Sequence, residues 1–173
     1  MTDEPGIPAS QTANNPNVVD SENTIARDVA RGVTRLLLAH GIASISELPL
    51  PDGRRCDIIG LAADGTFTIV EIKSCLADFR TDQKWHEYRA YCDRLFFAVE
   101  AVFPAEILPE ETGLILADRY GGAFMREAPA HPLAPARRKA MLLRFARTAA
   151  ARLARERDPG LVPPGGIKGG ELA

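Results

Sequence analysis

Several features that mark other classes of protein are scarce or missing in this chain of 173 residues. Its three cysteines show no C-x-x-C spacing, which argues against a disulfide framework or a zinc site and predicts reduced thiols. No apolar run approaches the roughly 18 residues that a membrane helix needs, and the acidic first residues are unlike a signal peptide. We therefore expect a cytoplasmic protein with no membrane partner.

Motifs for common cofactors are also missing. The chain has no G-x-x-x-x-G-K-[ST] loop for nucleotide phosphates, no G-x-G-x-x-G for dinucleotides and no H-E-x-x-H for catalytic zinc. These absences argue against the usual ATP-dependent, dinucleotide-dependent and zinc-hydrolase interpretations.

The composition is that of an ordinary globular protein with polar tails. Hydrophobic residues make up 46% and charged residues 25% of the chain, enough to build one domain with a core. Residues 1–20 are rich in Asn, Pro, Ser, Thr and Asp, and residues 158–173 are rich in Gly and Pro, so both are predicted to be disordered tails. Residues 21–157 must then carry the fold.

The periodicity of apolar residues predicts alternating helices and strands. A first helix begins at Asp20 or Ser21 and ends at Gly41, with Arg27, Asp28, Arg31 and Arg35 on its polar side. The further elements are a strand over 43–48, a hairpin of 56–61 with 66–73, a helix over 81–93, a strand over 95–99, a hairpin of 113–118 with 123–126, and a helix over 135–157. This order indicates an α/β sheet with helices on its faces.

The last helix is strongly basic although the net charge of the chain is −2. Residues 134–157 include eight basic residues and one acidic residue. Helical spacing places Leu142, Phe145, Ala149 and Leu153 on one side and Arg137, Arg144, Arg147 and Arg155 on another. Arginine forks bind phosphate well, so we take Arg137, Arg138, Arg144 and Arg147 as candidate DNA-binding residues. A solvated helix face and an acidic protein partner are the alternatives.

One strand turns from apolar to charged along its length. Side chains alternate in a strand, so Glu71 and Lys73 share one face, after Phe67 and Ile69. Their position relative to Asp57 depends on the hairpin register. If the loop consists of Asp64-Gly65 alone, Asp57 lies opposite Ile72 and its side chain points away from that of Glu71. If the loop has three residues, 63–65, with a left-handed Gly65, Asp57 lies opposite Glu71 and the two carboxylates share one face. We predict the three-residue loop.

Two carboxylates so placed suit a hard divalent cation. Asp57, Glu71 and the carbonyl of Ile72, completed by water, provide the oxygen ligands that Mg²⁺ prefers. Lys73 stands where it could orient or help deprotonate a water molecule that attacks phosphorus.

This order of elements, with an Asp-bearing strand followed by a Glu-x-Lys strand, resembles the PD-(D/E)XK nuclease superfamily. Within it, the chain resembles the bacterial MmcB-like DNA repair family over roughly residues 22–155. The residues that carry this likeness are Val70-Glu-Ile-Lys-Ser74, Asp78-Phe79-Arg80, Asp82-Gln-Lys-Trp85, Tyr88, Cys92-Asp93-Arg94-Leu95-Phe-Phe-Ala-Val99, and the segments 113–118 and 134–139. The resemblance implies an α/β fold with a restriction-endonuclease-like mixed sheet, a role in DNA damage repair, and a metal-dependent phosphodiesterase site.

Carried over residue by residue, the resemblance makes Asp57 and Glu71 metal ligands, Lys73 the catalytic lysine, and Mg²⁺ or Mn²⁺ the cofactor. The chain has Cys56 where the superfamily's name has proline. The literal Pro-Asp pair ends at Asp52, in a Pro-Asp-Gly turn outside the apolar run, so Asp57 is the favoured ligand.

Other residues are weaker candidates for the same site. Some superfamily members add a glutamate from the first helix, which here is Glu22, with Glu47 as a weaker alternative. Lys84 and Tyr88, four residues apart, lie either near the substrate or in surface packing beside a core Trp85. The alternative for Glu71 and Lys73 is an ion pair at a sheet edge with no catalytic role. If the site is too incomplete to cleave, the alternative function is a DNA-binding or partner-recruiting module on the same fold.

Overall fold

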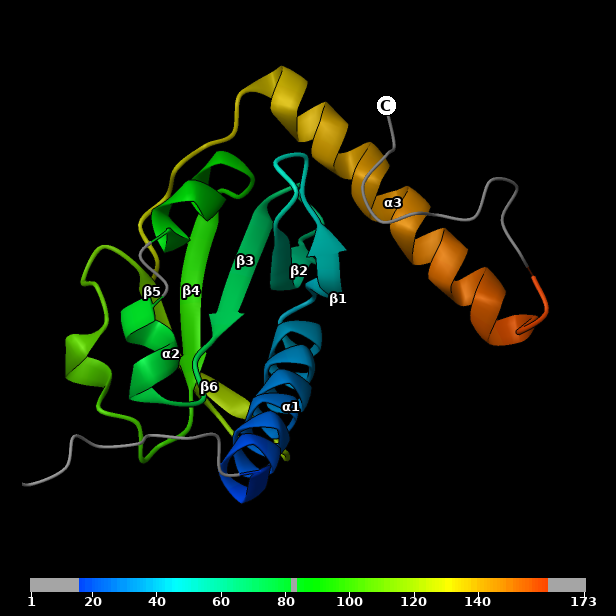
Figure 1. The fold of residues 1–173 in the computed structure, drawn as a ribbon. Helices are drawn as coiled ribbons and strands as arrows, with labels where there is room; N and C mark the ends of the chain where they lie inside the picture. The colour runs from blue at the N-terminus through cyan, green and yellow to red at the C-terminus, as the bar shows by residue number, and fades with distance from the viewer. Residues whose placement is uncertain (1–15, 82–83, 162–173) are drawn as a thin grey trace, which may run out of the picture.

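The structure is a computed structural model that describes residues 16–81 and 84–161, and it is built on a six-stranded mixed sheet (Figure 1). Across the sheet the strands follow chain order, with β3, β4 and β5 parallel and the other neighbours antiparallel. Their bounds are β1 Ala43–Pro49, β2 Arg55–Leu61, β3 Phe67–Ile72, β4 Arg94–Val99, β5 Gly113–Ala117 and β6 Gly122–Arg126. Helices flank this sheet, so the predicted α/β class is confirmed.

Helix α1 (Pro16–Ala39) begins earlier than the sequence pattern predicts. Proline at the first position of a helix sacrifices no intrahelical hydrogen bond, because the first N–H groups have no partner within a helix. Residues 16–20 therefore lie in the helix and not in the tail to which they were assigned, while residues 1–15 lie outside the described part. The apolar stripe is as predicted, since Val29, Val33, Leu36 and Leu37 are all buried.

The hairpin of β2 and β3 has the predicted register. Ile58 pairs with Val70, so Asp57 and Glu71 stand opposite each other one step further along. This register directs both carboxylates to the same face of the sheet.

Gly65 makes this register possible. The loop covers residues 63–65, and the main chains of Ala62 and Thr66 hydrogen-bond across its base. Gly65 has φ of +84°, a left-handed conformation that a residue without a Cβ adopts without strain.

The connection from β3 to β4 differs from the single helix predicted over 81–93. It contains a short α-helix, α2 (Leu76–Thr81), and a 3₁₀ helix, η1 (Trp85–Ala90). Trp85 and Tyr88 are three residues apart, a spacing that places both on one side of a 3₁₀ helix as well as of an α-helix. The Trp85 ring is half-buried and packs against Phe97 at 5.9 Å, so Trp85 borders the core and does not lie within it as predicted.

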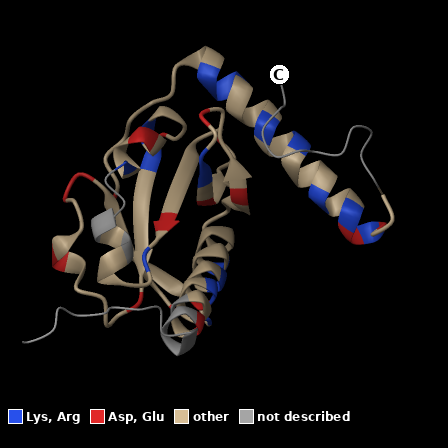
Figure 2. Ribbon diagram, in the orientation of Figure 1, with Lys and Arg blue, Asp and Glu red and all other residues tan. Residues whose placement is uncertain are grey.

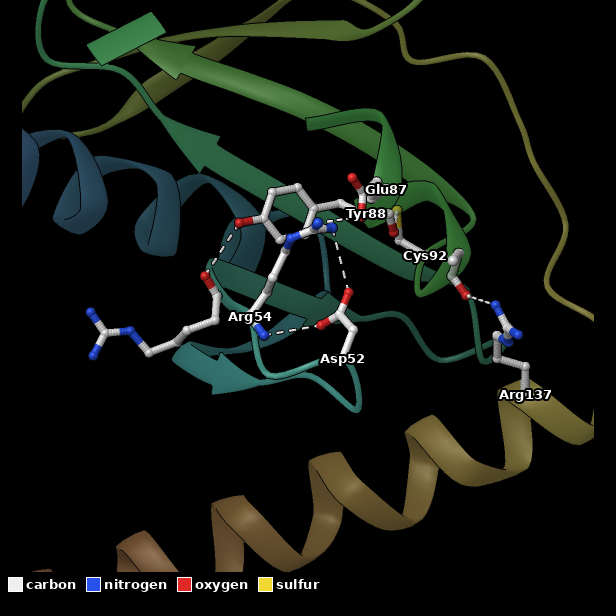
Figure 3. Close-up of polar contacts among 8 residues, drawn as sticks. Asp52, Arg54, Glu87, Tyr88, Cys92 and Arg137 are labelled. Carbon is white, nitrogen blue, oxygen red and sulfur yellow. Dashed lines mark hydrogen bonds and ion pairs between the residues drawn. The ribbon is translucent and has the colours of Figure 1, made fainter. Parts of the chain in front are cut away.

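The turn before β2 fixes η1 in place (Figure 3). The guanidinium of Arg54 forms ion pairs with Asp52 in the same turn and with Glu87 on η1. The Tyr88 hydroxyl donates a hydrogen bond to the Arg55 carbonyl at 3.4 Å. Asp52 thus lies in an exposed turn and is paired with Arg54. This supports Asp57 over Asp52 as the candidate metal ligand.

Helix α3 (Pro135–Arg157) lies beside β1 at one edge of the sheet (Figure 1). Its buried residues are Met141 and Phe145, whereas Leu142 and Leu153, predicted to share the apolar side with Phe145, are exposed. Arg144 donates to the Pro49 carbonyl, and Arg152 donates to the carbonyls of Ser46 and Glu47 in β1. In the part of the chain that the structure describes, no helix has the length and apolar character needed to cross a membrane.

An ion pair between a buried aspartate and a partly exposed arginine ties α3 to the start of β3 and β4. Asp93 is 6% exposed and accepts main-chain hydrogen bonds from Phe67 at 2.7 Å and from Leu133 at 2.9 Å. The Arg138 guanidinium donates to both Asp93 carboxylate oxygens, at 2.6 and 2.9 Å. Arg138, a predicted DNA-binding residue, is therefore engaged within the domain.

This pair predicts loss of stability in acid. Burial alone raises the pKa of Asp93, but hydrogen bonds from Arg138, Leu133 and Phe67 outweigh burial and the pKa is lowered. A lowered pKa stabilises the fold above the unfolded value of about 3.9 and stops doing so as pH falls through the folded value. We expect the free energy of unfolding to fall below about pH 4, and to fall less in Asp93→Asn. Urea unfolding at pH 7 and pH 3 tests this, and equal losses in both proteins would contradict it.

Candidate active site

An open pocket of about 1030 Å³ lies where the end of β3 meets the start of β2. Figure 1 shows this end of β3 between α1 and α2. Asp57, Glu71, Ile72 and Lys73, the residues predicted for metal binding and catalysis, all line it. The structure therefore brings this predicted set together in one pocket.

Asp57 and Glu71 are held by each other's strands. The main-chain N–H of Asp57 donates to the Glu71 Oε1 at 3.2 Å, and the N–H of Ile72 donates to the Asp57 Oδ2 at 2.8 Å. Glu71 is 4% exposed and Asp57 is half-buried. Each carboxylate is thus fixed in orientation by a main-chain donor from the opposite strand, which keeps the pair converged.

Lys73 follows directly on β3 and is 5% exposed. Its main-chain N–H donates to the Ala98 carbonyl at 3.0 Å, which extends the pairing of β3 with β4 by one residue. Its Nζ lies 5.9 Å from the centre of the Phe97 ring, within the range of cation–π attraction. A buried lysine is unusual, and this one lines the same pocket as Glu71.

The donor set fits a hard divalent cation held by few protein ligands. It offers two carboxylates and a main-chain carbonyl, oxygen donors of the type that Mg²⁺ and Mn²⁺ prefer. No group of three or more His, Cys, Asp or Glu suited to a metal is found among the described residues. Mg²⁺ does not require such a group, because it is often held by one or two carboxylates together with water and substrate phosphate.

The weaker candidate residues differ in whether they line this pocket. Tyr88 lines the pocket and is 9% exposed. Lys84 is exposed, immediately before η1, and does not line the pocket. Glu22 belongs to α1 by its main chain, but its side chain lies outside the part that the structure describes. Glu47 lines the pocket and pairs with Arg55 at 3.2 Å.

Sequence reasoning missed two basic residues of this pocket, Arg27 and Arg55. Helical periodicity places Arg27 on the polar side of α1, and nothing in that pattern distinguishes a solvent-facing residue from one at a pocket rim. Arg55 could have been found, because it lies two residues before Asp57 and strand alternation sets both on one face.

The remaining predicted DNA-binding residues gather at a second groove. Arg137, Arg144 and Arg147 line a groove of about 490 Å³ between α3 and the segment that contains Tyr91. The Arg137 guanidinium lies 5.7 Å from the centre of the Tyr91 ring. It also donates to the Ala90 carbonyl, which is the contact drawn from Arg137 in Figure 3. Figure 2 shows Lys and Arg spread along α3.

The three cysteines differ in accessibility, which predicts selective labelling. Cys56 and Cys92 are buried, and burial raises the pKa of each thiol to about 12. Cys75 is half-buried and lines the pocket. Because the thiolate is the reactive form, we expect one fast-reacting thiol in the native protein at pH 8 and three in denaturant. Titration with a chromogenic disulfide checks this, and a fast thiol that survives Cys75→Ser would contradict it.

Together, the sheet and the pocket define an α/β protein whose central hairpin ends in a carboxylate pair and a buried lysine. The family described as DNA repair protein MmcB-like matches residues 13–160, and the chain belongs to this family. The chain is also similar to a solved structure, the SPO1766 protein of unknown function from Silicibacter pomeroyi, at 47% identity and a TM-score of 0.77, over 80% of this chain and 96% of that one. No curated protein is significantly similar in sequence.

Proposed function

We propose that this protein acts in DNA repair by hydrolysing phosphodiester bonds of DNA with the help of Mg²⁺ or Mn²⁺. The observation that carries the proposal is the convergence of Asp57 and Glu71 beside a buried Lys73, in a pocket of a protein from a DNA repair family. The order of these residues on β2 and β3 also supports a place in the PD-(D/E)XK superfamily.

Asp57, Glu71 and the carbonyl of Ile72 are the groups that would hold the cation. A bound divalent cation supplies Lewis-acid stabilisation for the negative charge that develops on the phosphoryl oxygens. The main-chain donors of Asp57 and Ile72 keep both carboxylates oriented before the substrate arrives, so no reorganisation is needed at the moment of reaction.

Lys73 would orient the water molecule that attacks phosphorus. Its position next to Glu71 on the same face lets its ammonium group orient the water and stabilise the charge that develops in the transition state. The oxygen of the water bonds to phosphorus while the bond to the leaving sugar oxygen breaks. A proton from the water ends on that oxygen, so one product carries a phosphate and the other a hydroxyl.

The proposal is tested by cutting assays on labelled DNA. Wild type, Asp57→Ala and Lys73→Ala are incubated with single-stranded, duplex and branched DNA in Mg²⁺, Mn²⁺ or EDTA. We expect cutting by wild type that depends on the cation and is lost in both variants. Cutting that persists in both folded variants, or no cutting by wild type on any of these substrates, would contradict the proposal.

A DNA-binding module without cleavage is the second candidate function. The observation that favours it is the separate groove on α3, lined by Arg137, Arg144 and Arg147 and distant in the chain from Glu71. Binding in EDTA that weakens steeply with salt, together with no cutting, would support it.

A further inference from the structure

Two arginines give the candidate pocket its balance of charge. Among the described residues that line it, Asp57, Glu71 and Glu47 are acidic, and Lys73 is buried at the end of β3. A polyanion approaching these groups alone would be repelled. The other basic residues in the described lining are Arg27 from α1 and Arg55 from β2, which belong to two different elements.

Arg27 is available to a ligand. It is exposed on α1 and makes no ion pair with another described residue. Arg31, one helical turn later, is also exposed but does not line the pocket. The two residues share a helix and a charge and differ in their access to the pocket.

Arg55 has a fixed main chain and an exchangeable side chain. Its main chain pairs with Pro49 in the sheet and its carbonyl accepts a hydrogen bond from Tyr88. Its guanidinium forms an ion pair with Glu47 at 3.2 Å, in which both side chains are more than half exposed. Exposed pairs of this kind contribute little stability, so Arg55 can exchange Glu47 for a phosphate at small cost.

We propose that Arg27 and Arg55 bind backbone phosphates of one DNA strand, next to the phosphate that faces Asp57 and Glu71. Guanidinium groups suit this role because they stay charged and donate two parallel hydrogen bonds to phosphate. Glu47 competes for Arg55 and so restrains DNA binding. The inference rests on the proposed function for the placement of the strand, but binding is measured without cleavage.

The first test is the salt dependence of binding. Anisotropy of a labelled single-stranded oligonucleotide is measured in EDTA for wild type, Arg27→Ala, Arg55→Ala and the matched control Arg31→Ala. We expect about tenfold weaker binding for each of the first two variants. The slope of log K against log salt should decrease by about 0.7 for each lost phosphate contact, and Arg31→Ala should resemble wild type. A duplex arm shows whether the same contacts serve paired DNA.

The second test uses a substitution that is expected to strengthen DNA binding. Glu47→Gln removes the competitor of Arg55, so we expect binding several-fold tighter than that of wild type. In the Arg55→Ala background, Glu47→Gln should change the DNA affinity little, because Glu47 is proposed to act on binding by competing for the Arg55 guanidinium. Arg55→Lys should restore part of the affinity, which a merely structural role for Arg55 would not explain.

The outcomes separate this inference from the proposed hydrolysis. If wild type cuts DNA but Arg27→Ala and Arg55→Ala bind with unchanged affinity and salt slope, the phosphate contacts are refuted and hydrolysis stands. If no form cuts but these variants weaken binding, hydrolysis is refuted and the contacts stand. Thermal unfolding of every variant is compared with wild type, and a gain from Glu47→Gln that persists without Arg55 would also refute the inference.

Discussion

Replacing Glu71 by glutamine is expected to abolish metal-dependent DNA cutting and to leave the fold intact. The amide oxygen of glutamine can still accept the main-chain N–H of Asp57 that Glu71 accepts at 3.2 Å. The change removes the negative charge that the proposed cation needs, in a site that is 4% exposed and therefore little screened by water. We expect a loss of about 100- to 1000-fold in the cutting rate, by analogy with the removal of one electrostatic group from other active sites.

The rate is measured as single-turnover cutting of labelled DNA in Mn²⁺, with thermal unfolding as the check on folding. Glu127→Gln is the matched control, since Glu127 is exposed and pairs only weakly, at 3.5 Å, with Arg94. Glu71→Gln cutting within tenfold of wild type would show that Glu71 is not a ligand of the reacting centre.

Removal of the Asp93 carboxylate is expected to have the largest effect on stability. Asp93→Ala leaves the main-chain N–H groups of Phe67 and Leu133 and the Arg138 guanidinium without their shared acceptor, in a site where Asp93 is 6% exposed. Leaving a buried main-chain donor without an acceptor costs about 1–3 kcal/mol, so we expect a loss of roughly 2–5 kcal/mol from the two N–H groups, while the partly exposed Arg138 adds little. Urea unfolding at pH 7 measures this loss.

Arg137→Ala is the control for that experiment. Arg137 neighbours Arg138 on α3, but it is exposed and makes a single hydrogen bond to the Ala90 carbonyl. Its loss should cost less than about 1 kcal/mol. An Asp93→Ala protein as stable as Arg137→Ala would mean that the Asp93 network contributes nothing beyond the ordinary hydrogen bonds of the surface.

The sequence was most informative where local conformation and chemistry coincide. An Asp-Gly pair between two β-branched runs predicts a hairpin, and choosing the left-handed Gly65 loop fixes the register. Once the register is known, strand alternation alone places Asp57 opposite Glu71 and sets Lys73 on the same face. The core of this candidate site could therefore be predicted from fewer than 20 consecutive residues.

The prediction failed where tertiary contacts choose between equivalent local patterns. The helical pattern of α3 offers two apolar stripes, and only packing against the domain decides that Met141 is buried while Leu142 and Leu153 are exposed. Arg138 is one of many arginines on α3, and its partner Asp93 is 45 residues away in the chain. Such a contact leaves no periodic signal in a single sequence.

The contacts of α3 with β1 also bear on how the protein avoids associating with itself. β1 is an edge strand, and a strand edge can pair with the edge of another chain and seed aggregation. Here Arg144 and Arg152 reach the carbonyls of Pro49, Ser46 and Glu47 from α3. The helix thus acts as a cover for the edge, and a chain shortened before residue 135 would expose a strand that natural sheets normally keep hidden.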